Sequence, residues 1–352
     1  MKSEVINIGS RSVGKEQPVF IIAEAGVNHN GDVKLAIELI KEAKKAGADC
    51  VKFQTFKADR IVTQNSPKAA YQLKTTDENE SQFDMLKQLE LNLEDYKFIL
   101  DECQRQDILF LSTPYNHEDA DFLNQLGVEA FKIASGQFVE YPFLSYLASF
   151  NKPLILSTGM CTEEEVRNTL NFLKDHGDPE LILLQCTTNY PASITDANIN
   201  AMVSMGLEMD VMIGYSDHVP NSYACMSAVA LGAQVIEKHF TLDTTMSGPD
   251  HSSSLNPEQF ALLVEGIRQV EKSLGSSKKQ PTQAEQKNTF GMRRCMIANQ
   301  GLQIGHVLQK EDIGFKRPMN GLSPTRFYEI LGKRIVRDLE KDEPITEDVI
   351  DW

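Results

Sequence analysis

The sequence lacks the patterns that mark several common classes of protein. No apolar run approaches the roughly 18 residues of a membrane-spanning helix, and the first residues contain no apolar segment typical of a secretory signal. The six cysteines form no C-x-x-C pair, and their apolar surroundings indicate free thiols in a reducing compartment. We therefore expect a cytoplasmic protein with no membrane partner.

Basic residues are also scarce, and the net charge of −15 is unevenly distributed. Residues 290–352 hold ten basic and ten acidic side chains, so the acidic excess belongs to the first 289 residues. A strongly acidic surface repels polyanions, so we expect no nucleic acid partner. A small anionic substrate is not excluded, because a local basic pocket can override the net field.

No G-x-G-x-x-G follows the first expected strand, which counts against a dinucleotide-binding, doubly wound sheet. Short apolar runs instead alternate eight times with helical segments, over the length typical of a (β/α)8 (TIM) barrel. The last of these helices is expected at 257–274. The expected strands cover residues 19–25, 49–55, 108–113, 129–135, 153–158, 181–187, 211–214 and 235–239.

A polar segment containing Pro281 separates the expected barrel from a C-terminal part without long helical periodicity. We predict a barrel domain at 1–274, a linker at 275–289 and a small, mostly β domain at 290–352. A polar excursion over 56–80 interrupts the barrel, and loops of this length are usually functional or disordered.

Two histidines follow neighbouring strands in the last strand–helix–strand unit. His218 comes after the seventh expected strand, and His239 ends the eighth. The C-terminal ends of barrel strands meet at one face, where active sites lie, so two imidazoles there can share a divalent metal. For either histidine alone, the simpler interpretation is a hydrogen-bonded polar residue at a strand exit.

Two lysines, Lys52 and Lys132, lie inside apolar strands. A buried ammonium is costly unless it is paired, so each lysine needs either an anionic substrate or a structural ion pair with a strand-end glutamate. The segments Ser135-Gly136 and Ser157-Thr158-Gly159 offer hydroxyls and backbone N–H groups that suit a phosphate. A single lysine would indicate a Schiff-base aldolase, whereas two lysines with paired histidines favour a metal and an anionic substrate.

Ordered strings along the whole chain resemble the sialic acid synthase family, which includes N-acetylneuraminate and legionaminic acid synthases. They include IAEAGVNHNGD, VKFQTFKAD, PKAAYQLKTT, FKIASG, CTTNYPA, GYSDH, IEKHFTLD, MSGPDH and KRPMNG. The C-terminal part resembles the antifreeze-like, or SAF, domain of that family. The resemblance implies an enzyme that condenses phosphoenolpyruvate with an N-acetylated mannose-type sugar and water, releasing phosphate by C–O cleavage and forming a nonulosonic (sialic-type) acid.

The resemblance also implies roles for individual residues. His218 and His239 would bind Mn²⁺, or another divalent metal such as Mg²⁺ or Co²⁺, and Glu24 would act beside them as a catalytic group. Arg317 would reach over the barrel of a partner subunit to the sugar N-acetyl group, which implies a domain-swapped homodimer. The implied substrate-binding residues are Lys52, Gln54, Tyr71, Thr113, Lys132, Ser135, Ser157, Asn189, Tyr190, Asp250 and Arg317.

One position departs from the family pattern. Thr188 stands where sialic acid enzymes often carry asparagine, and Asn189 follows it. The sugar therefore stays open between N-acetylmannosamine and a 2,4-diacetamido-6-deoxy-mannose, which would make the enzyme a legionaminic acid synthase. Two other classes remain as alternatives: a non-catalytic carbohydrate-binding protein, and a 3-deoxy-sugar-phosphate synthase, which would lack the SAF domain.

Overall fold

The computed structural model describes residues 4–69, 72–74, 76–77 and 79–352. The chain divides into two compact units, Met1–Gly275 and Ser276–Trp352. Each unit has a hydrophobic core of its own.

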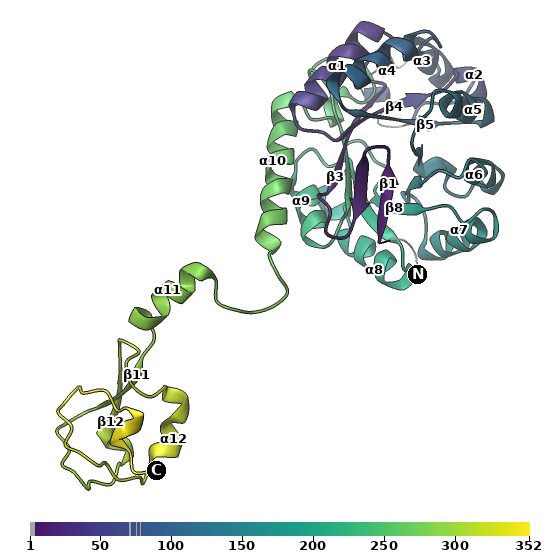
Figure 1. The fold of residues 1–352 in the computed structure, drawn as a ribbon. Coiled ribbons are helices and arrows are strands. Elements are labelled where there is room, and N and C mark those ends of the chain that lie inside the picture. The colour runs from purple at the N-terminus through teal and green to yellow at the C-terminus, as the bar shows by residue number, and fades with distance from the viewer. Residues whose placement is uncertain (1–3, 70–71, 75, 78) are drawn as a thin grey trace. The chain divides into compact units, whose positions relative to one another are not determined.

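Eight parallel strands form the sheet of the first unit (Figure 1). The strands at the two ends of the hydrogen-bonded order, β5 and β6, lie against each other, so the sheet curves into a near-closed barrel, as the eightfold alternation predicts. The order is β5 (Leu109–Pro114), β4 (Cys50–Thr55), β3 (Phe20–Gly26), β10 (Val235–His239), β9 (Met212–Asp217), β8 (Leu181–Cys186), β7 (Leu154–Ser157) and β6 (Phe131–Ile133).

Helices surround the strands on the outside of the barrel (Figure 1). Asp32 caps the first of these helices, and Thr162 and Glu165 form a capping box at the start of another. Among the described residues, no helix is long and apolar enough to cross a membrane. The helices are α1 (Val33–Lys45), α4 (Asp95–Gln106), α5 (His117–Gln125), α6 (Tyr141–Ala148), α7 (Glu163–Asp175), α8 (Ile199–Met209), α9 (Tyr223–Ala230) and α10 (Pro257–Leu274).

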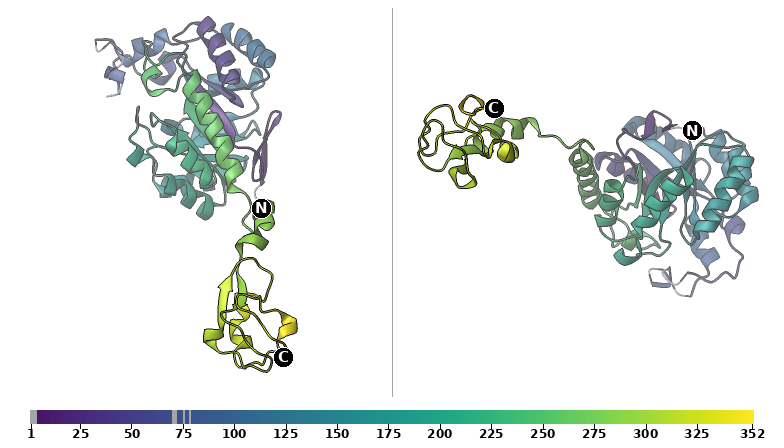
Figure 2. Two further views of the ribbon diagram at one scale, coloured as in Figure 1. Left: turned by 90° about the vertical axis from the view of Figure 1, so that its left-hand side faces the viewer. Right: turned by 90° about the horizontal axis from the view of Figure 1, so that it is seen from below.

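An antiparallel hairpin of β1 (Val5–Ile8) and β2 (Arg11–Gly14) precedes the barrel and was not predicted (Figure 2). Its buried side chains, Ile6 among them, pack on residues near the N-terminal ends of the barrel strands, including Phe20 and Met212. The hairpin therefore closes the end of the barrel opposite to the strand exits, and the interior at that end is apolar.

The excursion after β4 contains regular structure, namely α2 (Ala58–Ile61), a 3-10 turn (Gln72–Lys74) and α3 (Gln82–Gln88). A small apolar cluster centred on Phe56 and Leu89 holds these elements beside the strand exits. The excursion therefore forms part of the wall around the C-terminal end of the barrel.

The second unit contains α11 (Gln283–Met292), which begins inside the segment predicted as a linker. Two short strands, β11 (Cys295–Ala298) and β12 (Ile313–Lys316), pair in antiparallel fashion, and the unit also contains a short helix, α12 (Phe327–Ile330). The run RIVRDL (334–339) contributes isolated β-bridges and no strand.

Candidate active site

The inward-facing positions of the barrel change from apolar to polar along the strands. In β10, Val235 belongs to the apolar interior, and Glu237 and His239 follow it at steps of two residues. The parallel register places Glu24 beside His239 on one side and beside Lys52 on the other. The polar strand ends that the sequence indicates therefore meet at the C-terminal end of the barrel.

Two lysines and two glutamates form a buried charge network at this end. Lys52 Nζ lies 2.6 Å from a carboxylate oxygen of Glu24 and 3.8 Å from one of Glu237. Lys132 Nζ lies 3.4 Å from Glu237. All four side chains are only 3–5% exposed. Ion pairs with glutamates therefore offset part of the cost of burying the two lysines. This is one of the two interpretations that the sequence allows, the other being an anionic substrate.

The two glutamates differ in their proton affinity. Burial raises the pKa of Glu24 to about 7, although Lys52 opposes the shift. Burial acts in the same direction on Glu237, but Lys132 and Lys52 outweigh it and hold the pKa of Glu237 below its ordinary value. Burial lowers the pKa of Lys132, although Glu237 opposes the shift. Burial acts in the same direction on Lys52, but Glu237 and Glu24 outweigh it and raise the pKa of Lys52. While both lysines are protonated, partial protonation of Glu24 leaves a local excess of positive charge for an anion.

A cavity of about 120 Å³ opens over this network. The hydroxyl of Ser157 is buried and has no hydrogen-bond partner in the described part of the chain, so it is available to a ligand. The predicted residues that line this inner cavity are Glu24, Lys52, Gln54, Thr113, Lys132, Ser135, Ser157, Tyr190, His218 and His239.

The two histidines lie close together at the inner cavity, with ring centroids 5.2 Å apart. His218 Nδ1 lies 2.7 Å from the carbonyl oxygen of Thr187, to which it donates, so Nε2 carries no proton in the neutral form of the ring. His239 Nδ1 is buried without a partner among the described residues. Burial lowers the pKa of His239 well below its ordinary value, so this ring is neutral, as a metal ligand must be.

These observations fit a divalent metal held by two imidazoles. Over the residues that the structure describes, no group of three His, Cys, Asp or Glu side chains could hold a metal. A metal bound by His218 and His239 alone keeps its remaining positions for substrate and water, which is the arrangement of a catalytic site and not of a structural one.

A second cavity of about 190 Å³ adjoins the first and shares Gln54, Tyr115, Tyr190 and His239 with it. Asp250 supplies a carboxylate, and burial raises its pKa to about 6. The rest of this outer cavity is lined mainly by apolar side chains from the β3 exit and the excursion after β4, with the amides of Gln72 and Gln82. The apolar residues are Val27, Phe56, Ile61, Val62, Met85, Leu86, Leu89 and Pro249.

The described structure does not assign three of the predicted residues to either cavity. Asn189 is exposed and is not a lining residue of either, whereas its neighbour Thr188 lines the inner one. Arg317 is exposed in the second unit, directly after β12. Tyr71 lies outside the described residues.

The inner cavity also contains residues that were not predicted as site residues. Glu237 and Ser216 belong to them, and Ser216 donates a 2.9 Å hydrogen bond to Glu237. Each precedes a predicted histidine by two positions, so the period-two alternation of a strand could have identified both. Tyr115 and Cys186 carried no comparable signal.

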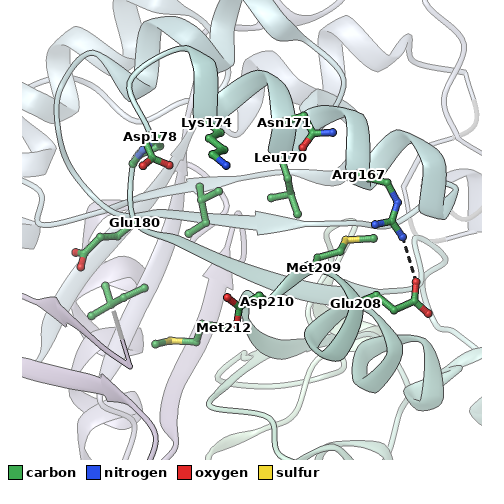
Figure 3. Close-up of a pocket in the computed structure, with 13 residues that line it drawn as sticks. Arg167, Leu170, Asn171, Lys174, Asp178, Glu180, Glu208, Met209, Asp210 and Met212 are labelled. Carbon is green, nitrogen blue, oxygen red and sulfur yellow. Dashed lines mark hydrogen bonds and ion pairs between the residues drawn. The ribbon is translucent and has the colours of Figure 1, made fainter. Parts of the chain in front are cut away.

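A larger cavity of about 640 Å³ lies near the N-terminal ends of β8 and β9, away from the strand exits (Figure 3). Its charged side chains are exposed, and some of them form surface ion pairs. Arg167, for example, is 45% exposed and bonds to Glu163 and Glu208 at 2.8 and 3.1 Å. Exposed pairs of this kind are ordinary surface features, so the chemistry favours the smaller cavities.

Comparisons with known proteins agree with this assignment. The model of the NeuB family matches residues 39–279, and that of the SAF domain matches residues 293–350. The N,N'-diacetyllegionaminic acid synthase of Campylobacter jejuni is 45% identical over 93% of this chain and 98% of its own. The enzyme of the same name from Legionella pneumophila is 43% identical over 94% of each.

A solved structure is similar as well. The N-acetylneuraminic acid (sialic acid) synthetase of Leptospira borgpetersenii, crystallised with citrate, superposes with a TM-score of 0.72 at 34% identity, over 81% of this chain and 95% of that one. The resemblance seen in the sequence is thus confirmed for both units. The chain is an enzyme of the NeuB family, with a SAF domain as its second unit.

Proposed function

We propose that this enzyme condenses phosphoenolpyruvate with a 2,4-diacetamido-6-deoxy-mannose and water, giving a legionaminic-type nonulosonic acid and phosphate. The observation that carries the proposal is the pair of adjoining cavities, which share His239: the inner one is charged, and the outer one combines polar groups with an apolar wall. The names of the two relatives with 45% and 43% identity point to the same product class.

The inner cavity would bind phosphoenolpyruvate. Lys52 and Lys132 would pair with its phosphate and carboxylate, and the hydroxyls of Ser135 and Ser157 would donate to the same oxygens. This role explains why the Ser157 hydroxyl is buried without a partner among the described residues and why the network keeps excess positive charge.

His218 and His239 would hold Mn²⁺, with Mg²⁺ or Co²⁺ as alternatives. When bound, the metal would polarise the aldehyde of the open-chain sugar as a Lewis acid. Tyr190 packs against both histidines, with its ring centroid 4.0 Å from that of His218 and 5.5 Å from that of His239. This contact limits rotation of both imidazoles and excludes water from one side of the site.

The reaction joins C3 of phosphoenolpyruvate to the aldehyde carbon, adds water at C2 and breaks the C2–O bond to phosphate. Glu24 would take the proton of the attacking water, since its pKa of about 7 allows both protonation states near neutrality. Lys52 and Lys132 would stabilise the charge that develops on the departing phosphate.

The outer cavity would receive the sugar beyond its reacting carbon. Its apolar wall suits the C6 methyl group and the methyl of a second acetamido group, whereas hydroxyls buried there would lose hydrogen bonds to water. N-acetylmannosamine is the second candidate, because Asp250 and the amide of Gln54 could bind its hydroxyls.

A panel assay with Mn²⁺ and phosphoenolpyruvate tests this proposal. Phosphate release would be measured with the 2,4-diacetamido sugar, N-acetylmannosamine and arabinose 5-phosphate. We expect the highest kcat/KM with the diacetamido sugar. A preference for N-acetylmannosamine would refute the choice of sugar, and absence of turnover with either acetamido sugar would refute the condensation itself.

We also propose that the enzyme works as a domain-swapped homodimer, in which Arg317 of one subunit binds the acetamido group of the sugar at the other subunit's barrel. A guanidinium has several donors for an acetamido oxygen, and the exposure of Arg317 leaves it accessible to such a ligand.

A further inference from the structure

A fully buried ion pair lies directly behind the two histidines. Lys238 Nζ is 2.6 Å from Asp217 Oδ2, and both side chains are 0% exposed. The two residues precede His239 and His218 in the chain, and the strand register pairs them across β10 and β9. Because successive side chains of a strand point to opposite faces, this pair lies under the outer helices while the histidines face the cavity.

Lys238 also holds the backbone segment that follows His218. Lys238 donates to the backbone carbonyl of Val219, and to that of Asn221 at 3.1 Å. Both carbonyls belong to the segment that leaves β9 after His218. One ammonium group on β10 therefore binds the residues on both sides of His218, while its own backbone continues into His239.

The aspartate of the pair is held from three further directions. Asp217 Oδ1 accepts from the hydroxyl of Tyr215 at 3.0 Å and from the backbone N–H of Val219 at 2.9 Å. Asp217 Oδ2 also accepts from the thiol of Cys225 in α9 at 3.1 Å. The carboxylate thus connects β9 and β10 to the helix that lies between them in the chain.

The cluster is better suited to fix geometry than to add stability. A buried ion pair contributes little net stability compared with an apolar pair of the same volume, but its hydrogen bonds are directional. His239 has particular need of such anchoring. The ring of His218 is oriented by the Thr187 carbonyl, whereas His239 Nδ1 has no partner within the described residues.

We propose that Lys238 and Asp217 are positioning residues, which hold His218 and His239 at the spacing needed to bind one divalent metal ion. The inference rests on the metal assignment in the proposed function. Groups that orient metal ligands typically change metal affinity by about 10- to 100-fold when they are removed, and the same magnitude is expected here.

The test uses the double variant Lys238→Met/Asp217→Asn in the full-length enzyme, which removes both charges and nearly keeps the shapes. Its matched control is Arg268→Met/Asp49→Asn, which removes an ion pair of 3.1 Å at the opposite end of the same barrel. Affinity for Mn²⁺ alone and for phosphoenolpyruvate alone would be measured by calorimetry, and thermal unfolding would be followed without metal.

We expect the Lys238/Asp217 variant to bind Mn²⁺ about 10- to 100-fold more weakly, with phosphoenolpyruvate affinity unchanged and with kcat recovering at high Mn²⁺. The control should bind Mn²⁺ as the wild type does. Equal weakening in both variants, or normal Mn²⁺ affinity in a folded Lys238/Asp217 variant, would overturn the inference while leaving the metal site intact.

A wild-type enzyme that binds neither Mn²⁺, Mg²⁺ nor Co²⁺ would refute the metal assignment and the inference together. If the double variant does not fold, Lys238→Arg takes its place, because it keeps the charge but not the fit of a compact ammonium to two carbonyls. That variant should weaken Mn²⁺ binding several-fold, and unchanged Mn²⁺ affinity in it would contradict the positioning role.

Discussion

The two ends of the barrel hold cavities of opposite character. β9 connects the two ends, since Met212 lines the cavity of about 640 Å³ at the N-terminal end, and His218 follows the strand at the C-terminal end, the mouth of the barrel. Charges at the N-terminal end are exposed, and Arg167 pairs with Glu208 on the surface (Figure 3). Charges at the mouth are buried. Because the pKa of Glu24 is raised to about 7, this carboxyl group is present in both protonation states near neutrality. Buried charge with a shifted pKa, and not cavity size, therefore identifies the site.

The largest difference between the two ends should appear when a histidine at the mouth is removed. His218→Ala or His239→Ala should abolish phosphate release at ordinary Mn²⁺ concentration and lower the bound metal, because two imidazoles are the only protein ligands proposed. Arg167→Ala, at the N-terminal cavity, should change neither. Steady-state assays with metal analysis measure both quantities. Full activity and unchanged metal content in either histidine variant would contradict the metal assignment.

Removing a lysine should give the next largest effect. Lys132→Met keeps the length of the side chain and removes its charge, and charge-assisted hydrogen bonds contribute about 1.5–3 kcal/mol, or about 10- to 100-fold in affinity. Phosphoenolpyruvate binding should weaken by that factor and the sugar KM should change little. Lys174→Met at the N-terminal cavity is the matched control. Unchanged phosphoenolpyruvate affinity in calorimetry of both Lys132→Met and Lys52→Met would count against the inner cavity as its site.

The barrel could be predicted because buried parallel strands read as short apolar runs and helices start at residues such as Asp32 and Thr162. Most of the residues at the mouth could be predicted because polar residues gather at the strand ends, where alternate side chains face the mouth. The N-terminal hairpin could not be predicted, because nothing in the sequence around Ile6 indicates that these residues cover the N-terminal end of the barrel. Thr188 and Asn189 show the other limit, since only the backbone path after β8 decides which of two adjacent side chains enters the cavity.

The mouth, unlike the N-terminal end, is proposed to need a second subunit. Arg317→Ala should therefore raise the sugar KM by about one to two orders of magnitude, the range of a charge-assisted hydrogen bond, with phosphoenolpyruvate affinity kept. Arg294→Ala is a control in the same unit. Steady-state kinetics with each substrate varied in turn measure this difference.

Mixed dimers then test whether the arginine comes from the partner. An Arg317→Ala subunit combined with a His218→Ala subunit should restore one working site, because that site takes its barrel from the first chain and its arginine from the second. No recovery after verified subunit exchange would exclude the crossed arrangement, though not a role of Arg317 at its own barrel.

The smallest effect should come from the apolar wall of the outer cavity. Leu86→Gln on α3 replaces an apolar contact with an amide, and a methyl group that loses such a contact gives up about 0.8 kcal/mol, which is about fourfold in kcat/KM. The loss should appear with the diacetamido sugar and shrink or reverse with N-acetylmannosamine, whose hydroxyls can bond to the new amide. Leu207→Gln is the control, because Leu207 is 81% exposed on α8. An equal loss with both sugars would mean that this wall supports the fold of the excursion and does not distinguish between sugars.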